Sequence, residues 1–296
     1  GSVLQILASP SADGLYHKAI SHSPSRIVFP SSSQANKLAD ALEIPIAKLK
    51  EELSNIPTED LLRVQDQVGT SAGTFDGKVV VGTPPEIIKT KSSANVPLLI
   101  GTNKDEGTFF SLFYPSEALP QITRGIGMNV TSGRDTNGYL DALKARGFKS
   151  DKELHDKVWV DMFRLAVLNA AAASAEVNSS VWVYRFDMDS DKAVFGQKLG
   201  ATHAAEIAFT FNDFASNQEH WLYDGKRDEV KELATAWSQT VIQFARTGEP
   251  NNAGLPFWPK FESINGSTMV LDETPRVESD LDKVDVNTWK AVGIEI

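Results

Sequence analysis

Three things that the sequence lacks narrow the range of functions. It contains no cysteine, which excludes disulfides, a cysteine nucleophile, cysteine-ligated zinc and iron–sulfur clusters. Basic residues are in the minority, since 29 Lys and Arg stand against 39 Asp and Glu and give a net charge of −10. A net negative charge repels phosphate groups, so nucleic acid and anionic membranes are not expected partners.

Long apolar runs are also missing. The segments Val96 to Ile100 and Leu165 to Ala173 fall well short of the roughly 18 residues of a membrane span, so no span is predicted. The start shows neither an initiator Met nor a signal-peptide pattern, and we expect the natural N-terminus to lie further upstream. The sequence does not define the compartment, although the cysteine-free composition favours a bacterial protein, cytoplasmic or secreted.

Hydrophobic periodicity predicts alternating helices and strands, the α/β class. Expected helices begin near Ser2, Ser33, Pro45 and Thr58, and two long ones span about Asp151 to Val177 and Asp228 to Thr247. Expected strands are Lys18 to Ser23, Val96 to Gly101, Val181 to Phe186 and Thr268 to Leu271, the last regular element predicted, with a turn and short strands over Phe75 to Val81. No repeat or linker interrupts the chain, so residues 1–296 are expected to form one domain or part of one.

Two segments have the context of a catalytic site. His203 follows a predicted strand in a loop, and Glu106 stands in a Lys-Asp-Glu-Gly turn directly after the strand that ends at Gly101. Taken alone, each has a plain structural interpretation, a helix-capping histidine and a solvated acidic turn. Their order along the chain favours a catalytic interpretation, because α/β-hydrolases carry nucleophile, acid and histidine in that order, with the acid and the histidine after late strands. The other histidines, His17, His22, His155 and His220, have no comparable context and are interpreted as structural.

Several collinear segments resemble the type B carboxylesterase family, which includes the cholinesterases and bacterial p-nitrobenzyl-esterase-like enzymes. They are Ser2–Pro10 with Gly14–Ser23, Asp76-Gly77 with Pro84, Pro97–Gly107 (PLLIGTNKDEG), Gly200–Phe211 (GATHAAEIAFTF), and Trp237–Asn251 with Phe257-Trp-Pro259. The resemblance covers nearly the whole chain and implies the C-terminal part of an α/β-hydrolase fold. A mostly parallel sheet flanked by helices is expected, with the N-terminal strands missing.

The resemblance also implies roles for four residues. Glu106 matches the triad acid and His203 the general base of a serine ester hydrolase that works through an acyl-enzyme. Glu206 and Ser23 match positions that support the histidine, although Pro24 departs from the family's usual glycine after that serine. A small-molecule carboxylic ester is the expected substrate, and no metal or organic cofactor is implied. The ester's identity and the oligomeric state cannot be read from the sequence.

The family's nucleophile is expected outside this chain, four positions before Gly1, together with the oxyanion loop. Gly69-Thr-Ser71-Ala-Gly73 fits GxSxG, but that motif acts only between a strand and a helix, and here it follows a predicted helix. We therefore expect the isolated chain to be inactive and, with an unpaired strand edge, poorly soluble. The alternative is a non-catalytic cholinesterase-like adhesion or interaction module, against which the retention of both Glu106 and His203 argues.

Overall fold

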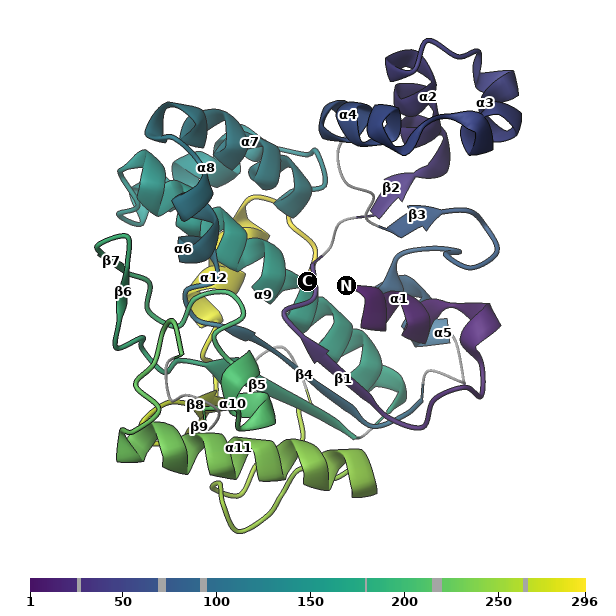
Figure 1. The fold of residues 1–296 in the computed structure, drawn as a ribbon. Helices are drawn as coiled ribbons and strands as arrows, with labels where there is room; N and C mark the ends of the chain where they lie inside the picture. Colours follow the sequence, from purple (N-terminus) through teal and green to yellow (C-terminus); the bar gives the residue numbers. More distant parts are fainter. Residues whose placement is uncertain (26–27, 69–72, 91–94, 179, 215–219, 263–265) are drawn as a thin grey trace.

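The computed structural model describes residues 1–25, 28–68, 73–90, 95–178, 180–214, 220–262 and 266–296. A five-stranded sheet lies at its centre (Figure 1), in the order β1 (Ala19–His22), β4 (Leu98–Asn103), β5 (Val181–Phe186), β8 (Thr268–Leu271) and β9 (Arg276–Glu278). The first four strands are parallel, and β9 pairs antiparallel with β8. This mostly parallel sheet, covered by helices, confirms the predicted α/β class.

The strand β4 is paired on both sides and is buried along its whole length. Its side chains alternate between two apolar clusters, since Leu98 and Ile100 belong to one and Leu99 to the other. A strand covered on both faces needs apolar residues at consecutive positions, which is why the run from Val96 predicted a buried strand.

Helices cover both faces of the sheet (Figure 1). On one side lie α1 (Ser2–Ala8), α5 (Pro84–Thr90) and the long α9 (Asp151–Val177), and on the other α10 (Ile207–Phe211) and α11 (Asp228–Thr247). The helix α9 is long and apolar enough to cross a membrane, but 72% of that apolar window is buried inside the structure. It is therefore the core helix that packs on β4, β5, α5 and α7 (Leu119–Val130).

The remaining elements surround this core. In Figure 1 a small unit of α2–α4 with β2 and β3 stands beside the main body. Its members are β2 (Val28–Pro30), α2 (Ser31–Ala41), α3 (Ile46–Glu52), α4 (Thr58–Val68) and β3 (Gly73–Phe75). The others are α6 (Gly107–Phe110), α8 (Thr136–Ala145), β6 (Ala193–Val194), β7 (Gln197–Lys198), α12 (Lys283–Ala291) and the 3-10 helices η1 (Pro10–Ala12), η2 (Leu53–Asn55), η4 (Ser111–Phe113) and η5 (Ser116–Ala118).

Two predictions about secondary structure were wrong in part or in full. The turn predicted within Phe75 to Val81 is present, but the short strands are not, since β3 ends at Phe75. The Asp76 carboxylate instead accepts hydrogen bonds from the backbone N–H groups of residues 78–80, at 2.8–2.9 Å. Thr268–Leu271 is not the last regular element, since β9 and α12 follow it. The helix α12 buries only Val286 and Trp289, a stripe too short to give a clear helical period in the sequence.

Candidate active site

Glu106 and His203 meet at the carboxyl ends of two neighbouring parallel strands. Glu106 follows β4 and precedes α6. His203 lies in the connection that leaves β5, after the antiparallel β6–β7 hairpin and before α10. A backbone bridge between Asp105 and Thr202 joins the two loops, and the Asp105 N–H donates to the Ala201 carbonyl at 3.0 Å. Loops beyond the carboxyl ends of parallel strands are where α/β folds place reactive groups.

The Glu106 carboxylate is fully buried and accepts three hydrogen bonds. His203 Nδ1 lies 2.5 Å from Oε2. The Asn103 N–H donates to Oε1 at 2.8 Å, and the Ser23 hydroxyl donates to the same oxygen. These donors replace the water that burial removes, which is the condition for keeping a carboxylate inside a protein.

The imidazole of His203 is held by Glu106 but still reaches the surface, with 30% of its side chain exposed. Burial works against the charged ring. The hydrogen bond and the charge of Glu106, together with the charge of Glu206, outweigh burial and raise the pKa of His203 above its usual value. With Nδ1 bound to a carboxylate, Nε2 is the nitrogen left to exchange a proton with a substrate or a nucleophile.

A second buried carboxylate, Glu206, lies three residues beyond His203. It accepts a hydrogen bond from Asn103 Nδ2 at 2.6 Å. Burial and the negative charge of Glu106 raise the pKa of Glu206 to about 7, although the bond from Asn103 acts in the opposite direction. The site therefore holds two carboxylates with different environments, one bound to the imidazole and one that titrates near neutrality.

Aromatic rings line the site beside the imidazole. Phe163 from α9 stacks on His203 with ring centroids 5.0 Å apart, and Phe110 from α6 lies at 5.1 Å. Phe109 is 6.1 Å from His203 and 6.2 Å from Trp221, which is 44% exposed. The surface next to the histidine is thus apolar and suited to uncharged hydrocarbon groups.

Ser23 takes an unusual backbone conformation to reach Glu106. Its φ of 42° is in the left-handed region that favours glycine, and its N–H donates to the Gly101 carbonyl at 2.8 Å. One residue earlier, His22 contacts the Tyr184 hydroxyl through Nδ1 at 2.6 Å. Burial lowers the pKa of His22 to about 4, so this ring is neutral at physiological pH.

The structure brings together all four residues singled out from the sequence. Ser23 and His203 contact Glu106, and Glu206 is joined to Glu106 through Asn103. Asn103 and Phe163 were not predicted. Asn103 ends β4 but lies two residues beyond the predicted strand Val96 to Gly101, so it was not considered, whereas Phe163 looked like any other apolar position on a long helix. Ser71, in the segment that fits GxSxG after a predicted helix, lies outside the described residues.

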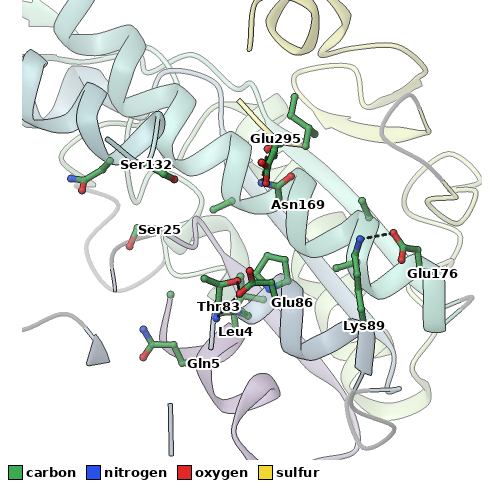
Figure 2. Close-up of a pocket in the computed structure, with 18 of the residues that line it drawn as sticks. Leu4, Gln5, Ser25, Thr83, Glu86, Lys89, Ser132, Asn169, Glu176 and Glu295 are labelled. Atoms are coloured by element: carbon green, nitrogen blue, oxygen red, sulfur yellow. Dashed lines mark hydrogen bonds and ion pairs between the residues drawn. The ribbon is translucent and has the colours of Figure 1, made fainter. Parts of the chain in front are cut away.

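A pocket of about 730 Å³ lies apart from these residues. Figure 2 shows it between α1, α5, α9 and the C-terminal segment, with Lys89 and Glu176 paired at 2.8 Å on its wall. Its lining includes neither Glu106 nor His203, so the pocket does not coincide with the candidate site. Among the residues that the structure describes, no group of three His, Asp or Glu side chains is arranged to hold a metal ion.

Comparison with known proteins identifies the class to which this fold belongs. Two solved structures match this chain, each over 97% of this chain and 60% of the other. One is a p-nitrobenzyl esterase (PNB esterase; TM-score 0.78, 25% identity). The other is a Geobacillus stearothermophilus carboxylesterase (TM-score 0.76, 25% identity). With the mostly parallel sheet flanked by helices, they define an α/β-hydrolase fold. The model of the carboxylesterase family matches residues 1–289, and the chain belongs to that family.

Curated relatives agree with this membership. The chain is 29% identical to the para-nitrobenzyl esterase of Bacillus subtilis (strain 168) over 293 residues, which are 94% of this chain and 58% of the relative. It is 28% identical to a phenmedipham hydrolase of Pseudarthrobacter oxydans, with 96% and 60% covered. The chain thus spans somewhat more than half the length of these relatives.

Proposed function

We propose that this chain supplies the acid and the histidine of a Ser-Glu-His triad in a carboxylic ester hydrolase. The observation that carries the proposal is the contact between His203 Nδ1 and the buried Glu106 carboxylate, on loops after two neighbouring strands. Membership of the carboxylesterase family supports the reaction class. Residues 1–296 would then form part of a single α/β-hydrolase domain, with the nucleophilic serine upstream of Gly1.

In this mechanism His203 transfers the proton and Glu106 keeps the ring in place. The serine oxygen attacks the ester carbonyl carbon while its proton passes to Nε2 of His203. The C–O bond to the alcohol then breaks, and the same proton goes to the leaving alkoxide, which leaves an acyl-serine. A water molecule then attacks the acyl-serine in the same way, with His203 again taking the proton and returning it to the serine oxygen, and the carboxylic acid is released. Glu106 stabilises the imidazolium that forms in each half, because its carboxylate lies against Nδ1.

The rings beside His203 support an uncharged ester as the substrate class. The rings of Phe109, Phe110 and Phe163 have centroids 5.0–6.1 Å from that of the imidazole and present carbon surface beside it. Among the described residues, the charges that act on His203 are the carboxylates of Glu106 and Glu206, and no Lys or Arg forms a hydrogen bond with the ring. A neutral acyl or alcohol group fits such surroundings better than a charged one.

The test uses the full-length polypeptide, including the residues that precede Gly1. Turnover of p-nitrophenyl acetate is measured for Glu106→Gln and His203→Gln. Each is expected to lower kcat by about 10³–10⁴-fold, the effect of spoiling a triad acid or base. Matched controls are Glu117→Gln and His17→Gln, which change the same residue types at exposed positions and should retain wild-type kcat.

Two outcomes would count against the proposal. If His203→Gln keeps more than a tenth of the wild-type kcat, His203 is not the general base. If the full-length protein neither turns over esters nor reacts covalently with a fluorophosphonate probe, the non-catalytic interaction module becomes the better interpretation. A single labelled serine in a GxSxG sequence upstream of Gly1 would support the placement of the nucleophile.

A further inference from the structure

One residue that the proposed mechanism does not use touches both carboxylates of the site. Asn103 ends β4 and is 1% exposed. Its backbone N–H donates to Glu106, and its side-chain nitrogen donates both to Glu206, at 2.6 Å, and to the Thr202 carbonyl, at 2.7 Å. Because the two side-chain contacts are both to acceptors, the amide nitrogen must face them, and the orientation of the carboxamide is determined.

The second contact ties this amide to the histidine loop. Thr202 directly precedes His203, and Thr108 from α6 reaches the Thr202 hydroxyl at 2.7 Å. The loop position therefore has support besides Asn103, from Thr108 and from the Asp105–Thr202 bridge. Removal of the Asn103 carboxamide should consequently perturb Glu206 more than it perturbs the backbone that carries His203.

The groups that face Glu206 come from several elements. Glu106 follows β4, Tyr184 lies on β5, Tyr223 precedes α11, and His203 lies on the same loop as Glu206. Burial raises the pKa of both tyrosines well above 10, so the phenols stay neutral where Glu206 titrates. Of these four groups only His203 can become positively charged, and only Glu106 competes with Glu206 for that charge.

We propose that Asn103 is a positioning residue that favours the ionised form of the Glu206 carboxylate and, through Glu206, the protonated state of His203. The proposal rests on the role given to His203 in the proposed function. A hydrogen-bond donor stabilises a carboxylate more than a carboxylic acid, so loss of the carboxamide favours uptake of a proton by Glu206. Once neutral, Glu206 no longer attracts a proton to the imidazole.

The sign of the expected change follows from two opposite electrostatic effects. The bond from Asn103 lowers the pKa of Glu206, and the charge of Glu206 raises the pKa of His203. Asn103→Leu removes the first effect and keeps both the approximate side-chain volume and the backbone N–H that binds Glu106. We therefore expect this variant to lower the pKa of His203, in the same direction as Glu206→Gln.

The experiment is an NMR titration of the full-length protein with ¹³Cε1-labelled histidine, in which the His203 signal is identified by its loss in His203→Gln. Glu206→Gln and Asn103→Leu are each expected to shift the midpoint down, by about 0.5–1 pH unit for the first and less for the second. The double variant should titrate like Glu206→Gln alone, because Asn103 acts through Glu206. A purely structural role for Asn103 would lower yield or kcat and leave the midpoint unchanged.

Three results would overturn the inference: an unchanged midpoint in Asn103→Leu, an unchanged midpoint in Glu206→Gln, or a further downward shift when Asn103→Leu is added to Glu206→Gln. Because the readout is ionisation, it is independent of ester turnover. Absent turnover with the expected shifts would refute the proposed function and leave the electrostatic role of Asn103 standing. Full turnover with no shift in Asn103→Leu would support the proposed function and refute the electrostatic role of Asn103.

Discussion

Substitution of Gly107 by alanine tests how closely Glu106, the proposed triad acid, depends on the packing of two helices. Gly107 follows Glu106 at the start of α6, where the chain passes against the backbone of α9. A Cβ at this position would lie 2.1 Å from the Asp156 carbonyl oxygen and 2.4 Å from the Asp156 Cα. Since both atoms are backbone, no side-chain rotation can relieve the clash.

The size of the required movement sets the expected effect. Ordinary contact begins near 3.4 Å, so the two helices must separate by about 1.3 Å at this point. The helix α9 is a buried core helix of 27 residues, whereas α6 has 4, so α6 and the adjoining Glu106 should move. We expect Gly107→Ala to cost about 1–3 kcal/mol of stability through overpacking. A displacement of this size at a catalytic group can lower kcat by about 10²-fold.

The assay compares urea unfolding and ester turnover of full-length Gly107→Ala with those of Gly125→Ala. Gly125 lies exposed in α7 with no heavy atom within 4 Å of an added Cβ, so alanine there should raise stability by about 0.5–1 kcal/mol and leave kcat unchanged. If Gly107→Ala unfolds within about 0.5 kcal/mol of the wild type, the tight contact with α9 is wrong. Lost stability with unchanged kcat would show that the contact with α9 is tight but that relieving the clash does not displace Glu106.

Three further predictions concern groups buried near the sheet. Because burial raises the pKa of Glu206 from 4.5 to about 7, the folded state holds a proton that the unfolded state loses between these values. Stability should therefore fall by roughly 3 kcal/mol as pH rises across this window, and Glu206→Gln should flatten that fall in urea titrations at a series of pH values. Arg164→Met should cost about 3–5 kcal/mol in urea unfolding by leaving Asp282 unpaired, since their charged groups lie 2.7 Å apart and are nearly buried, and Asp282→Leu should restore part of the loss. Ser23→Ala should lower stability by about 1 kcal/mol through the lost donor to Glu106, and no loss in unfolding experiments would contradict that contact.

Local signals in the sequence were sufficient to predict the helices whose ends are marked by nearby residues. The helix over Asp151–Val177 begins after Ser150, whose side chain forms a capping box with Glu153, and the helix over Asp228–Thr247 ends at Gly248 in a left-handed conformation. Both were predicted at these bounds because caps and apolar periodicity act between residues close in sequence. The helix α12 lacked such signals, and its position follows from what Val286 and Trp289 pack against.

The order of residues along the chain pointed to Glu106 and His203, because each follows a strand in the order that α/β-hydrolases use, and the resemblance to the carboxylesterase family implied their roles. Only the tertiary structure decided that Glu106 takes three donors, that Phe163 stacks on His203, and that Asn103 joins two carboxylates. Asn103 and Glu206 are 103 residues apart in the sequence. Such a contact depends on the register of β4 against β5 and on the path of the loops beyond them, and no local pattern encodes either.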